Sequence, residues 1–393
     1  MSGLALILSG GGARGAYEVG VLSYALDHLH HIRKRPVRFD YVLGTSVGAI
    51  NGCFLASHID EPVFGVRRLA NLWSDVRVDE VLGFGLSQIT SLPRLLLGGG
   101  AQAVGVFDVS PMARLVEREI DWRAITRALR EKKMRALSVS ATEVSTGKTV
   151  LFMQTAPGVK LPAVAPPRTV IRHSRVGPVH ALASAAIPIM FPPVRLGHHL
   201  YMDGGIRQNT PIAPALRLGA SHIFVIGLSR ELSGLPKGST QEPCPNVAFV
   251  LGKVLNAFLL DHVTSDFEVL DRVNNLIDLG VETFGPAFLD QLNGAAAEAG
   301  KAPFRRVKTL VVRPSEDLGK VAADHVRSSK LRAGPSLRRL LALLDVGQAT
   351  EADLASYLLF DGAFARKLIE LGRTDAEAQR AEIQAFFEDA ERG

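Results

Sequence analysis

One strand–turn–helix pattern constrains this chain more than any other: G-x-S-x-G over residues 44–48, directly after a short apolar run. The run, residues 41–43, has the length and character of a buried strand. A turn this tight needs small residues on both sides, which Gly44 and Gly48 supply, and it holds Ser46 in a strained conformation with its hydroxyl above the sheet edge. The pattern favours a nucleophile elbow. A serine in a Gly-rich turn without any chemistry is the alternative.

A second strand and a glycine loop are expected at the N-terminus. Residues 4–8 form a continuous apolar run, typical of a buried parallel strand, and Gly10-x-Gly12-x-x-Gly15 follows it. The spacing fits a dinucleotide fingerprint, but the acidic residue Asp40 precedes the next strand instead of ending it, and no Gly-Lys-Ser/Thr completes a phosphate loop. Successive backbone N–H groups at a helix N-terminus form an anion nest. Beside a nucleophilic serine, such a nest is expected to be an oxyanion hole.

An aspartate at the end of a predicted strand is the third candidate. Residues 200–205 end in Asp203-Gly204-Gly205, an open turn from which a carboxylate can face a pocket. A plain turn-forming Asp-Gly is the alternative.

The order and context of these three motifs resemble the patatin-like phospholipase family. Further similarity lies in residues 183–193 and 209–211, and the resemblance covers roughly residues 3–230. A less specific similarity, to the tail of bacterial members, lies in a late predicted strand, residues 307–312, and in residues 356–361. It implies an α/β fold, a three-layer sandwich in which helices flank a mainly parallel sheet. It also implies a Ser–Asp dyad with Ser46 as nucleophile and Asp203 as base.

The resemblance further assigns an oxyanion loop and the glycines around it. Gly10, Gly11, Gly12 and Arg14 match the loop, with Arg14 either reinforcing the oxyanion site directly or anchoring the loop. The motif-supporting glycines are Gly15, Gly44, Gly48, Gly204 and Gly205. The family's known activities are acyl hydrolysis of phospholipids, lysophospholipids, galactolipids or neutral glycerides. The expected function is therefore a serine lipid acyl hydrolase that cleaves carboxylic ester bonds.

The remaining sequence predicts a catalytic domain over residues 1–320 and a helical C-terminal extension over residues 321–393. The apolar, Gly-rich stretch 82–106 is either a buried connector or a mobile lid over the site. The Pro-rich stretch 156–175 is expected to be a surface loop. The last segment, 374–392, is expected to be a charged helix with few core residues.

Composition limits the partners. The chain has 393 residues, 47% hydrophobic and 21% charged, which is an ordinary globular composition. Its 45 basic and 39 acidic residues leave a formal charge of +6, which suits an anionic lipid surface. No Lys/Arg run with interleaved aromatic residues supports nucleic-acid binding. Cys53 and Cys244 belong to no metal or redox pattern, which favours a reducing compartment.

No cofactor and no metal are expected, since no His/Cys/Asp cluster has ligand spacing. No signal peptide is expected, and no uncharged apolar run approaches the roughly 18 residues of a membrane-spanning helix. The predicted partner is a lipid substrate at a membrane surface, and the predicted location is cytoplasmic, with peripheral membrane association as an option. The sequence carries no indication of oligomeric state.

Two alternatives stay open. An α/β-hydrolase-type esterase would need a Ser-His-Asp triad, and His222, His262 and His325 follow Asp203 in the chain. In that fold, however, the elbow usually comes after several strands. The other alternative is a non-catalytic membrane-binding scaffold, from which loss of activity on a single change of Ser46 would distinguish an enzyme.

Overall fold

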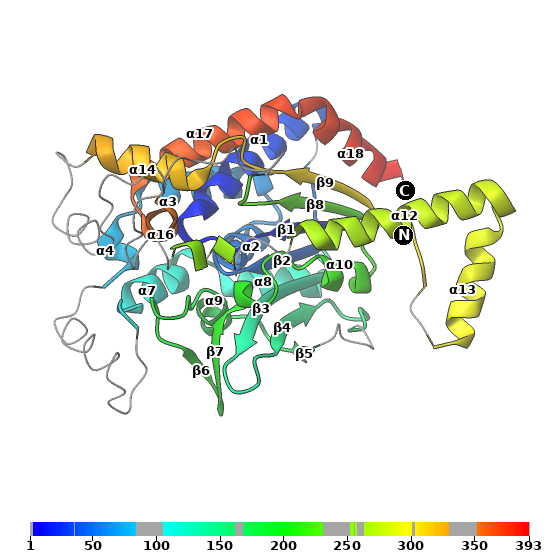
Figure 1. Ribbon diagram of the computed structural model, residues 1–393, viewed down its shortest axis with the longest axis horizontal. Coiled ribbons are helices and arrows are strands. Elements are labelled where there is room, and N and C mark those ends of the chain that lie inside the picture. The colour runs from blue at the N-terminus through cyan, green and yellow to red at the C-terminus, as the bar shows by residue number, and fades with distance from the viewer. Residues whose placement is uncertain are drawn as a thin grey trace, which may run out of the picture.

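The computed structural model describes residues 3–34, 36–83, 105–161, 168–230, 252–254, 256–257, 263–300, 303–329 and 352–392. A nine-stranded, mostly parallel sheet runs through the centre, with helices on both faces (Figure 1). Its main path is β5-β4-β3-β2-β1-β8-β9, while β7 pairs with β3 and β6 pairs with β7. The strands are β1 Leu4–Leu8, β2 Tyr41–Thr45, β3 Ala136–Glu143, β4 Thr149–Thr155, β5 Thr169–His173, β6 Val194–Leu196, β7 His199–Asp203, β8 His222–Ile226 and β9 Lys308–Val312.

The described helices form the outer layers. They are η1 Gly12–Arg14, α1 Gly15–Arg33, α2 Val47–Ser57, α3 Pro62–Asp75, α4 Val78–Val81, α7 Ser110–Glu119, α8 Trp122–Arg130, α9 Pro178–Ser184, η2 Gly204–Ile206, α10 Ile212–Leu218, α12 Val263–Phe284, α13 Phe288–Glu298, α14 Leu318–Ser329, α16 Asp353–Leu358, α17 Gly362–Ala378 and α18 Arg380–Arg392. Over the described part of the chain, none of these helices combines the length and apolarity needed to span a membrane.

The side chains of β1 alternate between two hydrophobic cores, one on each face of the sheet. Leu6 and Leu8 belong to a core shared with α1, α2, α3 and α17, whereas Ala5 and Ile7 belong to a second core shared with α10 and α12. Successive side chains of a strand point to opposite faces. A strand covered on both faces must therefore be apolar throughout, which is why residues 4–8 form an uninterrupted apolar run. The predicted three-layer α/β sandwich is confirmed.

Parallel pairing brings the first two motif loops together. β1 pairs with β2 in parallel, with Leu8 opposite Gly44, so the loop after β1 and the turn after β2 leave the same edge of the sheet. β2 pairs with β3, with Thr45 opposite Ser140, and the next β3 residue, Ala141, lies opposite Asp203 of β7. The strand register therefore places Asp203 close to Ser46, the residue that follows Thr45.

The stretch 156–175 differs from the sequence-based expectation. It contains β5, Thr169–His173, which pairs in parallel with β4 at the edge of the sheet. The strand is half-buried and carries Arg172 and His173, so it lacks the apolar pattern of a central strand. An edge strand that keeps one side toward water is a weak sequence signal.

The C-terminal helices contribute buried residues to the core of the fold. Ile383, Phe386 and Phe387 of α18 are buried in the same core as α1. α17 packs along α1 at very close range: a β-carbon at Gly20 would lie 2.1 Å from the Ile369 carbonyl oxygen. The remainder of residues 374–392 is mostly exposed and charged, as expected, and the aromatic residues of α18 pack against Phe224 of β8. The domain boundary near residue 320 stays a prediction.

Three further expectations fall on residues outside the described ranges. Most of the 82–106 connector or lid does so, because residues 84–104 are not described. Cys244 and His262 lie outside as well. Cys53 is described, and it is a fully buried core residue of α2.

Candidate active site

The turn between β2 and α2 has the strained geometry of an elbow. Ser46 has φ 54° and ψ −126°, in a region that non-glycine residues rarely occupy. A β-carbon at Gly44 would lie 2.4 Å from the Gly48 carbonyl oxygen, and one at Gly48 would lie 2.4 Å from the Leu8 carbonyl oxygen. Both distances are shorter than real contacts allow, so the turn and its approach to β1 require glycine at both positions.

The Ser46 hydroxyl forms a hydrogen bond with the Asp203 carboxylate. Ser46 Oγ donates to Asp203 Oδ2 at 2.6 Å, and the Gly205 N–H donates to the other carboxylate oxygen at 2.7 Å. Asp203 stands at the end of β7, where η2 begins, and the Gly204-Gly205 sequence permits the tight turn that brings this N–H back. The second and third motifs of the sequence therefore meet in one hydrogen-bonded pair.

Burial changes the acidity of this pair. Asp203 is fully buried, and loss of hydration raises its pKa to about 7, while the hydrogen bonds from Ser46 and Gly205 act in the opposite direction. A general base works best when its pKa lies near the operating pH. The site therefore holds a hydroxyl and a carboxylate at proton-transfer distance, with the pKa of the carboxylate tuned toward neutrality.

Ser184 fixes the elbow from the opposite side, a role that the sequence patterns did not reveal. Its hydroxyl accepts the Ser46 backbone N–H at 2.8 Å and donates to the Ser140 carbonyl at 2.5 Å. It is completely buried at the end of α9. It thus ties the strained residue to β3. Only the family resemblance marked the segment around it, since a serine in a small-residue helix carries no signal by itself.

The glycine loop lies against the elbow. A β-carbon at Gly10 would be 3.0 Å from Ser46 Cβ, and one at Gly15 would be 2.5 Å from the Val47 side chain. Gly10 itself is engaged by Asn209: its N–H donates to Asn209 Oδ1 at 2.9 Å, and Asn209 Nδ2 donates back to the Gly10 carbonyl at 3.1 Å. The N–H of Gly10 therefore already has a partner, and the expected place of Gly10 among the oxyanion donors stays a prediction.

The next two residues differ from Gly10. Within the described residues, the backbone N–H groups of Gly11 and Gly12 have no hydrogen-bond partner. Gly12 has φ 57° and opens the short helix η1. Two successive N–H groups without a partner, in a buried loop next to Ser46, are the arrangement expected of an anion nest.

The Arg14 guanidinium contacts side chains in the C-terminal part of the chain. Its guanidinium donates to Ser356 and forms an ion pair with Asp353, while its backbone N–H donates to the Gly11 carbonyl. Of the two roles left open by the sequence, these contacts fit the anchoring role. Both side-chain partners lie in α16, far along the chain from the three motifs.

Of the histidines considered for a triad, His222 and His325 lie in the described ranges, and both contact carboxylates other than Asp203. The hydrogen bonds of the Ser46 hydroxyl and the Asp203 carboxylate run to each other and to Gly205. His222 pairs with Asp389 at 2.7 Å, and His325 pairs with Asp361 at 3.3 Å. The two described histidines that follow Asp203 in the chain thus contact carboxylates in the C-terminal part of the chain.

An apolar cavity of about 280 Å³ is lined by Val47, the residue after Ser46, whereas Ser46 and Asp203 are not among its lining residues. Val47 and Phe54 of α2 form one wall, and α3, α4 and α7 form the others, with Leu69, Trp73 and Met112 among the lining side chains. Charged side chains also line the cavity, among them Arg68 and Glu119, which form an ion pair. In the described parts of the chain, no three His, Cys, Asp or Glu side chains come together as a metal site.

Comparison with known proteins identifies a family to which this chain is similar. A family model described as Patatin-like phospholipase matches residues 6–216. A protein of Pseudomonas aeruginosa named cGAMP-activated phospholipase is 31% identical over 208 residues, which are 52% of this chain and 53% of that protein. A protein of Invertebrate iridescent virus 6 named probable lipid hydrolase 463L is 25% identical over 219 residues, or 54% of this chain and 63% of that protein. Less than two thirds of either relative is therefore covered.

One solved structure extends the comparison. Human GIVD cytosolic phospholipase A2, in complex with methyl gamma-linolenyl fluorophosphonate, is similar with a TM-score of 0.41 and 12% identity, over 99% of this chain and 59% of that one. The family model alone spans more than half of this chain, from β1 into α10, and includes the glycine loop, Ser46 and Asp203. The chain is thus a member of the patatin-like phospholipase family.

Proposed function

We propose that this protein is a serine lipid acyl hydrolase that cleaves carboxylic esters of phospholipids or related acyl lipids with Ser46 as nucleophile and Asp203 as base. The observation that carries the proposal is the 2.6 Å hydrogen bond between Ser46 Oγ and the buried Asp203 carboxylate. Membership in the family and the names of the relatives agree with it.

The reaction follows from this pair in two halves. Asp203 takes the proton as Ser46 Oγ attacks the ester carbonyl, and a tetrahedral oxyanion forms. The oxyanion collapses, the acyl–oxygen bond breaks, and the leaving alcohol takes the proton from Asp203. Asp203 then accepts a proton from water, which attacks the acyl-enzyme. Collapse of this second intermediate returns the proton to Ser46 and releases the fatty acid.

In this proposal, the Gly11 and Gly12 N–H groups bind the oxyanion. Their lack of a partner supports the assignment, as does the position of the loop beside Ser46. Gly10 serves by holding the loop to Asn209, and Arg14 serves by anchoring it. One oxyanion donor is typically worth about 3 kcal/mol of transition-state stabilisation. A dyad without histidine must depend strongly on such donors.

The acyl chain is proposed to enter the cavity that Val47 helps to line. Its lining by Leu69, Trp73 and Met112 would remove apolar chain surface from water, a gain of roughly 0.8 kcal/mol per buried methylene.

The mild basic excess and the lipid substrate suggest that the enzyme acts at a membrane surface, with a cytoplasmic location. The choice between a connector and a lid for the stretch 82–106 stays open, since residues 84–104 lie outside the described residues.

A lipid panel tests the proposal. Purified wild type and Ser46→Ala are incubated with phospholipids, lysophospholipids, galactolipids and neutral glycerides of several acyl lengths, and the products are resolved by mass spectrometry. Wild type is expected to release free fatty acid from at least one class, more from long than from short chains. Ser46→Ala is expected to release none above background. Equal release by both proteins would exclude Ser46 as the nucleophile, and no release by the wild type would favour the scaffold alternative.

A further inference from the structure

A segment beyond the family match lies directly on the glycine loop. The family model ends at residue 216, but α16, Asp353–Leu358, packs against η1. All six residues of α16 are buried. A part of the chain that the family model leaves out is therefore in contact with the loop proposed to bind the oxyanion.

Three side chains of this segment surround the Arg14 guanidinium. Its Nε donates to Ser356 Oγ at 2.7 Å, its Nη2 lies 3.1 Å from Asp353 Oδ1, and its Cζ lies 4.2 Å from the centroid of the Tyr357 ring. The Arg14 and Asp353 side chains are only 3% and 6% exposed. Lys253 forms a second ion pair with Asp353, at 2.9 Å.

The main chains touch as well. A β-carbon at Gly12 would lie 2.2 Å from the Tyr357 carbonyl oxygen, so the loop backbone rests on the backbone of α16. Gly12 also has a left-handed φ, and its N–H is one of the two without a partner among the described residues. α16 therefore contacts the part of the loop that is proposed to bind the oxyanion.

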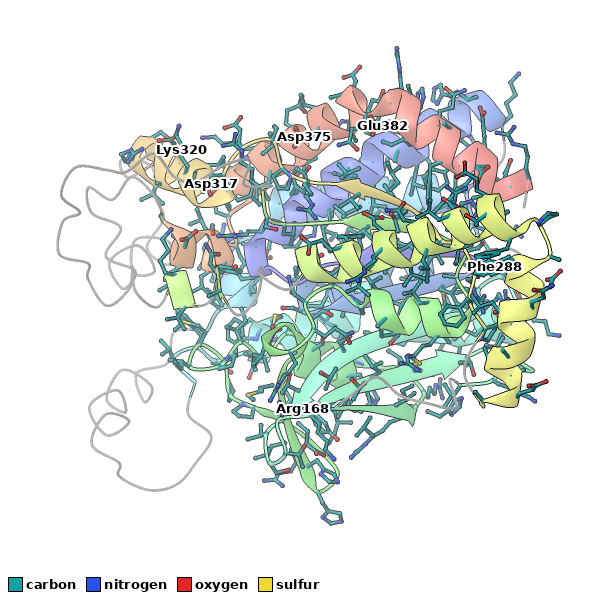
Figure 2. The ribbon with its side chains drawn as sticks, turned by 45° about the vertical axis from the view of Figure 1, so that its right-hand side comes forward. Arg168, Phe288, Asp317, Lys320, Asp375 and Glu382 are labelled. Carbon is teal, nitrogen blue, oxygen red and sulfur yellow. The ribbon has the colours of Figure 1, made fainter. Side chains whose placement is uncertain are left out.

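The ion pair is not needed merely to attach the C-terminal tail, because the tail has other buried anchors. Tyr17 donates to Asp375 of α17 at 2.9 Å, and α17 packs along α1; Figure 2 labels Asp375 on this helix. A buried charged pair often gives no more stability than an apolar contact would, so stability alone does not account for this pair. The geometry that the pair fixes is that of Arg14 and the adjoining glycines.

We infer that α16 completes the active site, with Asp353 and Ser356 as positioning residues that act through Arg14. They hold the loop so that the Gly11 and Gly12 N–H groups keep their direction toward the oxyanion. This inference rests on the proposed function and adds to it a requirement from outside the family match. Neither residue touches the substrate, so their loss should slow the chemical step without weakening substrate binding.

The test compares Asp353→Asn and Ser356→Ala with Asp375→Asn, a matched control that alters another buried anchor of the same tail. Steady-state kinetics on a soluble short-chain ester give kcat and KM. Hydrogen exchange, followed by mass spectrometry, reports the mobility of residues 9–16 independently of activity. In both α16 variants kcat should fall by about 10- to 100-fold, since loss of one oxyanion donor costs on the order of 10²–10³. KM should change by less than about twofold, because uniform binding is untouched.

The exchange of residues 9–16 should accelerate in the two α16 variants and stay at the wild-type rate in Asp375→Asn. Ser356→Ala removes a single hydroxyl, so it keeps the test decisive if Asp353→Asn folds poorly. A kcat in both α16 variants equal to that of Asp375→Asn would overturn the inference, and so would faster loop exchange in all three. A wild type without esterase activity would instead reject the proposed function, while the exchange data would still decide whether α16 holds the loop.

Discussion

Asp203→Asn is expected to abolish hydrolysis while making the folded protein more stable at alkaline pH. The amide has nearly the shape of the carboxylate but cannot take the Ser46 proton. A general base contributes about 10²–10⁴ in rate, so activity should fall by at least that factor. The gain in stability follows from burial, which raises the pKa of Asp203 to about 7, well above the ordinary pKa of an aspartate.

The sign of the stability effect is fixed by linkage. A carboxyl whose folded pKa is raised stabilises the fold while protonated, below its unfolded pKa, and that stabilisation is lost as the pH rises through about 7. A pKa difference of this size between the folded and unfolded chain corresponds to at most about 4 kcal/mol. Asparagine never ionises, so Asp203→Asn should gain free energy of unfolding over the wild type as pH increases.

Urea unfolding at about pH 5 and about pH 8 measures this gain. Asp79→Asn, at an exposed carboxylate of α4, controls for the change of residue type. A difference between Asp203→Asn and wild type that is the same at both pH values would show that no buried carboxylate is being ionised. The same pKa predicts the activity profile: kcat/KM should rise roughly tenfold per pH unit below about pH 7 and then level off, because only the ionised carboxylate is a base.

Gly48→Ala is expected to disrupt the elbow, whereas Gly52→Ala, in the same helix, is expected to be harmless. A β-carbon at Gly48 would lie 2.4 Å from the Leu8 carbonyl oxygen, a backbone atom at the centre of the sheet. At Gly52 the nearest atoms are side-chain carbons of Val42 and Leu8, at 3.1 and 3.7 Å. The main chain of β1 cannot move without displacing the glycine loop, but side-chain carbons can adjust.

Both substitutions gain about 1 kcal/mol of helix propensity, which makes them a matched pair. Gly48→Ala should nevertheless lose about 3 kcal/mol or more, the scale of overpacking and strain, and most of its esterase activity. Gly52→Ala should unfold within about 1 kcal/mol of the wild type and remain active. Thermal and urea unfolding, with esterase assays on the folded fraction, measure both effects. Similar behaviour of the two variants would contradict the close approach of α2 to β1.

The parts of the fold that the sequence predicted well are those determined by local patterns. The run at residues 4–8 is apolar because β1 is covered on both faces, and the following glycines mark its loop. The elbow glycines are required by contacts within a few residues of Ser46 and with the neighbouring strand. Once β1 and β2 pair in parallel, the two loops must be neighbours, so their shared site followed from sequence order.

What the sequence did not predict depends on contacts between distant residues. Arg14 and Ser356 are 342 positions apart, and Gly10 and Asn209 are 199 apart. Nothing near Gly10 in the chain shows that its N–H is used, and nothing near Arg14 shows where its charge is neutralised. β5 was missed for a different reason, because an edge strand with Arg172 keeps one side toward solvent and lacks a regular apolar pattern.

The most direct test of the central claim is covalent labelling of the proposed nucleophile. A fluorophosphonate reacts with an activated serine hydroxyl, and peptide mapping by mass spectrometry identifies the modified residue. We expect one adduct, on Ser46, with slower labelling in Asp203→Asn because the hydroxyl then lacks its base. We expect no adduct in Ser46→Ala. An adduct that persists in Ser46→Ala, or that maps to another serine in the wild type, would contradict the assignment of Ser46 and Asp203 as the catalytic pair.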